Sequence, residues 1–175
     1  MIRIETERLI LRQFLEEDAP FFFELNNDFE VIKYTGDLPF KTIEASKALI
    51  TGYDQYQKYN SGRLTVVLKE TNELLGWCGL KFHPENGDTD LGYRFKKIYW
   101  DKGYATEASI ACIDYGFNKL NLPVILATAV KENRASLKVM EKIGMNYWKE
   151  IIEHDSLCAV YRITPDQFSI SLCAQ

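Results

Sequence analysis

The spacing of hydrophobic positions changes in the middle of the chain, around residues 98–108. Residues 90–95 alternate between apolar and other side chains, which is typical of a β-strand. Beyond Gly103, small and apolar residues recur at spacings of three and four, as on one face of a helix: Ala105, Ala108, Cys112 and Tyr115. This stretch therefore predicts a strand, a glycine turn and a helix in succession.

The same patterns extend over the rest of the chain. Further strands are expected at residues 2–14, 64–68, 74–82, 124–130, 147–152 and 157–163. Further helices are expected after Glu16 and at residues 31–34, 42–59 and 134–143. The order is strand, helices, three strands, helix, strand, helix and two strands. It predicts one domain over residues 1–175, of the α/β (α+β) class, with a mixed seven-stranded sheet and helices on both faces.

Several residues are expected to fix the ends and the buried sides of these helices. Thr42 and Asn133 have the side chains of N-caps, and Gly144 follows a helix as a C′ glycine does. The residues expected to face the core are Phe21, Phe22, Leu25 and Phe29 in the first helical stretch and Ile43, Leu49, Ile50 and Tyr53 in residues 42–59.

Composition narrows the classes of function. The net charge of −4 argues against nucleic acid as the main partner. No run of 18 apolar residues and no signal-peptide pattern is present, so we expect no membrane segment and a cytoplasmic protein. The four cysteines are widely spaced and the two histidines have no spaced partners, which argues against a metal site.

The turn at residues 101–106 is a candidate anion site. A helix begins there, and its first N–H groups carry a partial positive charge that suits a diphosphate. Lys102 adds a full charge, and Gly103 lets the backbone approach a ligand closely. An ordinary glycine turn explains the same residues, so from this stretch alone both interpretations stay open.

Three segments together resemble the GNAT superfamily of acetyl-CoA-dependent N-acyltransferases, in particular its ribosomal-protein N-terminal (alanine) acetyltransferase branch. The first is Thr-Glu-Arg-Leu-Ile-Leu-Arg at residues 6–12. The second is Leu-Gly-Tyr-Arg-Phe at residues 91–95 with Trp-Asp-Lys-Gly-Tyr-Ala-Thr-Glu-Ala at residues 100–108. The third is Asn-Arg-Ala-Ser at residues 133–136 with Glu-Lys-Ile-Gly-Met at residues 141–145. One departure is Trp100, because the family loop usually begins with Gln or Arg.

The resemblance implies a fold and a cofactor site. The sheet is expected to be mostly antiparallel, and its fourth and fifth strands, at residues 90–95 and 124–130, are expected to splay apart. The pantetheine arm of acetyl-CoA would pair with backbone groups at the open strand edge. The cofactor-binding residues so implied are Tyr93, Arg94 and Phe95 for the arm, Asp101, Lys102, Gly103, Tyr104, Ala105 and Thr106 for the diphosphate, and Asn133.

Asn133 and Ser136 have a structural and a functional interpretation. By residue type, Asn133 is a helix cap and Ser136 lies in the first turn of that helix. The resemblance implies that Ser136 also donates a proton to the leaving thiolate. A carboxylate is needed to accept the proton of the amine, and the candidates are Asp90, Glu150, Glu153 and Asp155. Among them, Asp155 lies near where the resemblance places this group, and the alternative interpretation is a plain turn aspartate.

The function expected from this resemblance is transfer of an acetyl group from acetyl-CoA to a primary amine, with a protein N-terminal α-amine as one acceptor. A small-molecule amine, such as an antibiotic or a polyamine, is the alternative acceptor. An acyl-CoA-binding sensor without turnover is the alternative class. The high aromatic content, 13%, is compatible with a homodimer, although no motif requires one.

Overall fold

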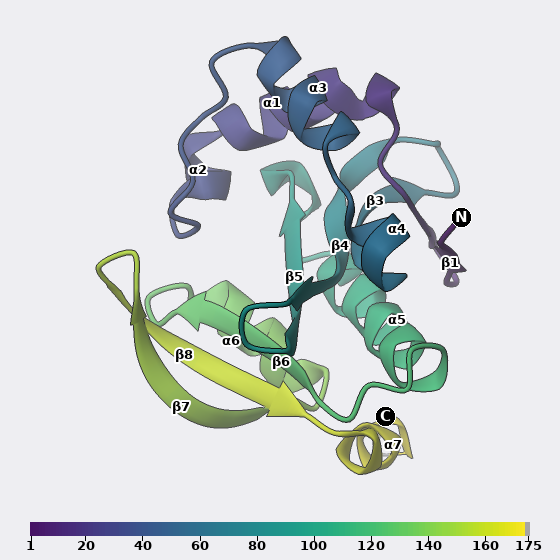
Figure 1. Cartoon of the computed structure of the whole chain (residues 1–175), viewed down its shortest axis with the longest axis vertical. Coiled ribbons are helices and arrows are strands. Elements are labelled where there is room, and N and C mark those ends of the chain that lie inside the picture. Colours follow the sequence, from purple (N-terminus) through teal and green to yellow (C-terminus); the bar gives the residue numbers. More distant parts are fainter. Residues whose placement is uncertain (174–175) are drawn as a thin grey trace.

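The computed structural model describes residues 1–173, with side chains described as far as residue 169. One eight-stranded sheet runs through this part of the chain in the order β1-β2-β3-β4-β5-β6-β8-β7 (Figure 1). Its neighbours pair antiparallel except β5 and β6, which are parallel. The strands are β1 (Arg3–Glu5), β2 (Leu9–Arg12), β3 (Gly62–Leu68), β4 (Leu74–His83), β5 (Asp88–Phe95), β6 (Ile125–Val130), β7 (Asn146–Glu153) and β8 (Ser156–Ile163).

The eighth strand arises because residues 2–14 form a hairpin rather than one long strand. Ile4 pairs with Leu11 across β1 and β2. The turn is closed by Thr6, whose N–H donates to the carbonyl of Leu9 at 3.0 Å and whose hydroxyl accepts from the Leu9 N–H at 2.9 Å. The more buried side chains stand at an even position in β1, Ile4, and at odd positions in β2, Leu9 and Leu11, because the chain reverses between them.

Helices cover both faces of the sheet, as predicted. They are α1 (Ala19–Asn27), α2 (Phe29–Ile32), α3 (Ile43–Thr51), α4 (Gln55–Tyr59), α5 (Tyr104–Asn118), α6 (Arg134–Lys142) and α7 (Pro165–Cys173), with 3-10 turns η1 (Glu16–Asp18) and η2 (Lys97–Tyr99). Adjacent residues of β4 show the two faces: Trp77 packs against the cluster of α1 and α3, and the Cys78 sulfur contacts Cys112 of α5 at 3.8 Å.

The helix predicted at residues 42–59 is two helices, α3 and α4. Thr42 caps α3 as predicted, accepting from the Ala45 N–H at 3.2 Å. The chain leaves the helix at Gly52, and the turn lets the Tyr53 hydroxyl accept from the Arg63 N–H at 2.8 Å. The predictions of buried side chains were wrong for Phe29, Ile43 and Leu49, which are exposed, whereas Phe22, Leu25 and Ile50 are buried.

The predicted splay lies between β5 and β6. The two strands pair only where Asp90 meets Leu126, so the rest of β5 has no partner strand on that side. On its other side β6 pairs with β8 over all six of its positions. The splay thus opens at the end of β5 that leads to α5.

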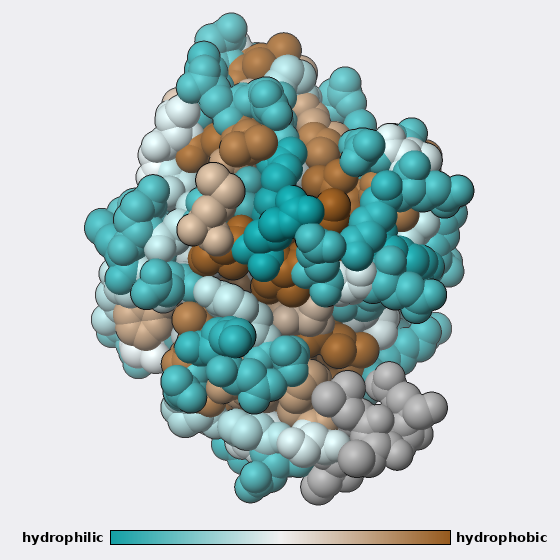
Figure 2. All heavy atoms as spheres, turned by 90° about the vertical axis from the view of Figure 1, so that its right-hand side faces the viewer, coloured by the Kyte–Doolittle hydropathy of each residue, from teal (hydrophilic) through white to brown (hydrophobic). Residues whose placement is uncertain are grey.

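On the face shown in Figure 2, hydrophilic and hydrophobic residues are interspersed among the described residues. None of the helices in residues 1–173 is long and apolar enough to cross a membrane.

Candidate active site

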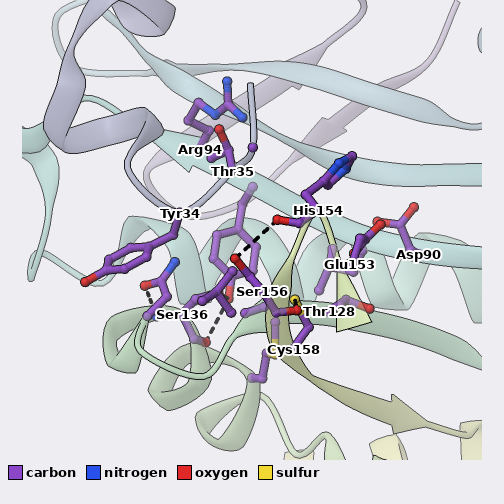
Figure 3. Close-up of a pocket in the computed structure, with 18 of the residues that line it drawn as sticks. Tyr34, Thr35, Asp90, Arg94, Thr128, Ser136, Glu153, His154, Ser156 and Cys158 are labelled. Atoms are coloured by element: carbon purple, nitrogen blue, oxygen red, sulfur yellow. Dashed lines mark hydrogen bonds between the residues drawn. The ribbon is translucent and has the colours of Figure 1, made fainter. Parts of the chain in front are cut away.

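A cavity of about 380 Å³ occupies the splay between β5 and β6. Its walls come from both strands, from the start of α6, from the residues after α2 and from the β7–β8 hairpin (Figure 3). Of the predicted site residues, Tyr93, Arg94, Asn133 and Ser136 line it. Segments far apart in the sequence therefore meet around one space.

The predicted diphosphate loop leads from η2 into α5. Asp101 and Gly103 have left-handed backbone conformations, with φ of 58° and 81°. Within the described part of the chain, the N–H groups of residues 101–106 have no acceptor, and the first helical bond runs from Glu107 to the carbonyl of Gly103. A set of free N–H groups at a helix start is suited to a phosphate. Ala105 and Thr106 lie in this first turn.

The side chains of the loop pack around it. Trp100, which stands where the family usually has Gln or Arg, donates from its indole nitrogen to the carbonyl of Phe95 at 2.9 Å, and so ties the loop to β5. The Lys102 ammonium lies 5.6 Å from the ring centre of Tyr99, and Tyr104 packs edge-on against the same ring.

At the strand edge, the backbone groups of the three predicted residues point in different directions. The Lys96 N–H donates to Leu75 in β4, so by alternation the backbone groups of Arg94 also face β4, and those of Tyr93 and Phe95 face the splay. Arg94 therefore has no free backbone edge for a ligand. The Phe95 carbonyl is taken by Trp100, which leaves the Phe95 N–H directed into the splay.

Asn133 is the N-cap of α6, since its side-chain oxygen accepts from the Ser136 N–H at 3.2 Å. Ser136 in turn contacts Tyr93: the Tyr93 hydroxyl lies 3.0 Å from the Ser136 carbonyl oxygen and 3.0 Å from its hydroxyl. Burial raises the pKa of Tyr93, so the phenol stays protonated near neutral pH. The cap and the cavity wall are thus formed by the same residues.

The four candidate carboxylates have different surroundings. Asp155 is exposed in the hairpin turn at a φ of 58° and is not among the residues that line the cavity. Glu150 is also outside it and pairs with Lys131 at 2.5 Å. Asp90 and Glu153 both line the cavity. Geometry therefore separates Asp90 and Glu153 from the other two, and the role of Asp155 stays a prediction.

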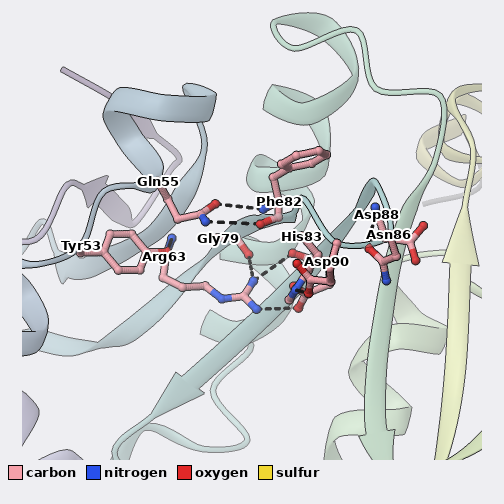
Figure 4. A network of polar contacts seen from close by, with 10 residues as sticks. Tyr53, Gln55, Arg63, Gly79, Phe82, His83, Asn86, Asp88 and Asp90 are labelled. Atoms are coloured by element: carbon pink, nitrogen blue, oxygen red, sulfur yellow. Dashed lines mark hydrogen bonds and ion pairs between the residues drawn. The ribbon is translucent and has the colours of Figure 1, made fainter.

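Asp90 belongs to a network of polar contacts on three neighbouring strands (Figure 4). Its carboxylate accepts from Arg63 at 2.5 Å and lies 2.6 Å from the His83 ring. Burial disfavours the charged carboxylate, but Arg63 and His83 outweigh it and lower the pKa of Asp90 to about 2. A carboxylate with this pKa is a weak proton acceptor, so Asp90 is suited to holding Arg63 rather than to deprotonating an amine.

Arg94 connects β5 to the helices above it. Its guanidinium donates to Asn26 of α1 and to Asp37 after α2, and it lies over the Trp77 ring at 5.3 Å. These contacts hold the segment after α2 beside the cavity. The segment after α2 also comes close to the β7–β8 turn at the mouth of the cavity. A Cβ built at Gly36 would lie 3.1 Å from the His154 ring.

Sequence reasoning did not find several residues of this site. The Tyr93 side chain, the Arg63–Asp90–His83 network and the contact of Gly36 with His154 depend on long-range pairing. One signal was available in the sequence, because Gly36 stands between Thr and Asp, as in a turn. In the structure its φ is 71°, a value that favours glycine.

Comparisons with known proteins agree with this geometry. Residues 8–146 match the model of the acetyltransferase (GNAT) domain family. An uncharacterised N-acetyltransferase of Bacillus licheniformis, p20, is 35% identical over 146 residues, which are 82% of each chain. The spermidine N(1)-acetyltransferase of Escherichia coli (strain K12) is 28% identical over 156 residues, 87% of this chain and 80% of that one.

A crystal structure gives the same result. A GNAT-family acetyltransferase from Bacillus anthracis superposes with a TM-score of 0.80 at 31% identity and covers 94% of this chain and 99% of its own. The family match spans most of the chain, and the splay and the free N–H groups lie where the family resemblance places the cofactor. The chain therefore belongs to the GNAT acetyltransferase family and is an N-acetyltransferase whose co-substrate is acetyl-CoA.

Proposed function

We propose that this enzyme acetylates a small-molecule primary amine that enters the cavity between residues 33–36 and the β7–β8 hairpin. The observation that supports this most is the close approach of the two loops beside the cavity, where a Cβ built at Gly36 would lie 3.1 Å from the His154 ring. The chemistry supplied by acetyl-CoA is an activated acetyl group on a thiol leaving group.

The chain offers acetyl-CoA a continuous set of backbone donors. The free N–H groups of residues 101–106 would take the diphosphate, and the open edge at Tyr93 and Phe95 would take the amides of the arm. Ser136, at the start of α6, lines the cavity that the arm would enter. The residues present fit the cofactor.

Three groups of the chain would act on the reacting atoms. The Phe95 N–H points into the splay, where it can stabilise an oxygen that gains negative charge, as oxyanion-hole donors do. Ser136, held by Tyr93, can give a proton to the leaving sulfur. Glu153 is the carboxylate at the cavity without an ion-pair partner among the described residues, and it can accept the amine proton directly or through water.

The shape and charge of the mouth favour a small acceptor. An N-terminal segment of a protein would need more room than a small amine between the two loops, which come close together at Gly36 and His154. The arginines in the cavity wall are paired, Arg63 with Asp90 and Arg94 with Asp37, so their charges repel an amine less. The similarity to an enzyme named for spermidine acetylation supports the same class of acceptor.

The test is thiol release from acetyl-CoA with a panel of acceptors. The panel contains spermidine, an aminoglycoside with primary amines, and short peptides that begin with Ala or Ser. We expect kcat/KM to be at least about tenfold higher for one of the small amines than for any peptide, a difference of about 1.4 kcal/mol in transition-state binding.

Two results would contradict the proposal. A preference for the peptides would replace the small amine by a protein N-terminus as acceptor. Calorimetric binding of acetyl-CoA without thiol release from any amine would indicate a binding role rather than turnover.

A further inference from the structure

We propose that Arg8 is a positioning residue for the diphosphate loop: with Glu107 it fixes the loop in the conformation that binds acetyl-CoA. This inference rests on the proposed site for the cofactor. It concerns two residues that lie within the resembling motifs but line no wall of the cavity.

Arg8 reaches both sides of the loop. Its Nη1 donates to the carbonyl of Lys102 at 3.1 Å, just before Gly103, and its Nε donates to Glu107 at 2.6 Å, in the first turn of α5. One guanidinium therefore spans the stretch whose N–H groups are free. Its planar fork can hold the two acceptors at a fixed separation.

Glu107 is held by more than this ion pair. Its other carboxylate oxygen accepts from the Thr6 hydroxyl at 2.5 Å and from the Arg8 N–H at 2.9 Å. Burial alone would raise the pKa of Glu107, but the bonds from Thr6 and Arg8 outweigh it and lower the pKa. The hairpin of β1 and β2 is thus fastened to α5 through a carboxylate that is ionised at neutral pH.

The Arg8 side chain also packs on the loop. The guanidinium lies 4.6 Å from the centre of the Tyr104 ring, at the first residue of α5. Its Nη2 would be 3.4 Å from a Cβ placed at Gly103. Arg8 thus contacts the loop before, at and after the glycine, on the side opposite to a ligand that would use the free N–H groups.

These contacts have an energetic role in binding. Gly103 and Asp101 occupy left-handed conformations that a free loop would leave easily. A loop that must be ordered on binding loses affinity, and a loop already held in place does not. The carbonyl of Lys102, turned back to Arg8, also leaves the N–H side of the loop facing outward for phosphate.

The test compares Arg8→Ala with Arg3→Ala. Arg3 is a matched control, because it also lies in the N-terminal hairpin and pairs with a carboxylate, Glu5, at 2.8 Å, but it does not touch the loop. Both variants lose one positive charge. We expect calorimetry with CoA to show at least about tenfold weaker binding for Arg8→Ala and a change of less than about twofold for Arg3→Ala.

A substrate without the diphosphate separates loop positioning from general damage. S-acetyl-pantetheine carries the thioester arm but none of the phosphates. Arg8→Ala should raise KM for acetyl-CoA with little change in kcat, and it should leave kcat/KM for S-acetyl-pantetheine within about twofold of wild type. A damaged fold would lower activity with both thioesters.

Two more variants separate geometry from charge. Arg8→Lys keeps the charge but cannot bond Lys102 and Glu107 together, so it should resemble Arg8→Ala rather than wild type. In the double variant of Arg8→Ala and Glu107→Ala, CoA binding should be little weaker than in the worse single variant, because the two residues act as one unit.

Different results would overturn the inference about Arg8 and the proposed cofactor site. Wild-type affinity for CoA in Arg8→Ala or in Arg8→Lys would overturn the inference. An equal loss with S-acetyl-pantetheine would overturn it as well. If wild-type protein itself does not bind CoA, the proposed cofactor site fails, and this outcome is distinguishable because it does not depend on any variant.

Discussion

The Tyr93 hydroxyl lies 3.0 Å from the hydroxyl of Ser136 and equally 3.0 Å from its carbonyl oxygen, and so links β5 to α6. The phenol has one proton, and the carbonyl can only accept it. When the phenol donates that proton to the Ser136 hydroxyl oxygen instead, the serine proton is free to reach the leaving sulfur. Tyr93 thereby orients Ser136 without itself needing to change protonation state.

Replacing Ser136 by Ala should lower turnover by about 100-fold, in the range expected for lost general-acid help. The fold should persist, because Ala is a good helix residue and the Ser136 N–H still bonds Asn133. CoA affinity should change by no more than a few-fold. The measurements are kcat on the best amine and calorimetry with CoA on the same variant.

Tyr93→Phe is the companion of this variant. It removes the orienting hydroxyl and leaves the serine, so it should lower kcat less than Ser136→Ala. A larger loss in Tyr93→Phe than in Ser136→Ala would assign the proton donor to Tyr93 instead.

Gly103→Ala tests the loop by strain and Gly103→Glu tests it by charge. A Cβ at Gly103 has room, its nearest neighbour being Arg8 Nη2 at 3.4 Å, so the cost of Ala is the left-handed φ of 81°, roughly 1–2 kcal/mol. The carboxylate of Glu also repels a diphosphate. CoA binding should weaken in the order wild type, Ala, Glu, and unchanged affinity in Gly103→Glu would disprove the loop assignment.

The sequence predicted those parts of the site that depend on local chemistry. The Asn133 cap and the glycine turn before α5 are decided within a few residues, so spacing was sufficient. The order of elements followed from local periodicity, apart from the hairpin in residues 2–14 and the break at Gly52, whereas the antiparallel sheet and its splay followed from the family resemblance.

The remaining features depend on register and on contacts between distant segments. Whether the backbone of Arg94 faces the splay or β4 depends on its pairing with Trp77, which periodicity does not reveal. Asp90 has a carboxylate that suits a base by type, and only its contacts with Arg63 and His83 show that it is committed elsewhere. Residue type therefore predicted candidates, and packing selected among them.

Asp90→Asn should destabilise the protein by about 3 kcal/mol, because it leaves Arg63 without its carboxylate in a mostly buried position. The loss should depend on pH. The pKa of Asp90 is lowered, so its contribution is present above its unfolded pKa, near 3.8, and is lost as pH falls toward about 2. The bond to Asp90 raises the pKa of His83 above 6.5, so the contribution of His83 is present below 6.5 and is lost as pH rises through the folded pKa.

Both contributions are present between pH 3.8 and 6.5, so the difference in unfolding free energy between wild type and Asp90→Asn should be largest there. Urea denaturation at about pH 5.5 and about pH 9 measures it. His83→Gln is the control, because it should remove the change between these two pH values and keep the pair of Asp90 with Arg63. A difference that is the same at both pH values would contradict the coupling.

His154→Ala should widen the range of acceptors. His154 lies in the β7–β8 turn with a φ of 47°, and its ring contacts Gly36 at the mouth of the cavity. Removing the ring opens the mouth without touching Ser136, Tyr93 or the cofactor loop. We therefore expect kcat/KM for peptides that begin with Ala or Ser to rise at least about threefold relative to the best small amine, with CoA affinity unchanged.

The variant Asp155→Ala is the matched control, because Asp155 shares the hairpin tip but does not line the cavity. If His154→Ala leaves the ratio of peptide to small-amine acetylation at its wild-type value, the contact of His154 with Gly36 does not restrict the acceptor. If Asp155→Ala lowers kcat for every amine, the proton acceptor is Asp155 rather than Glu153.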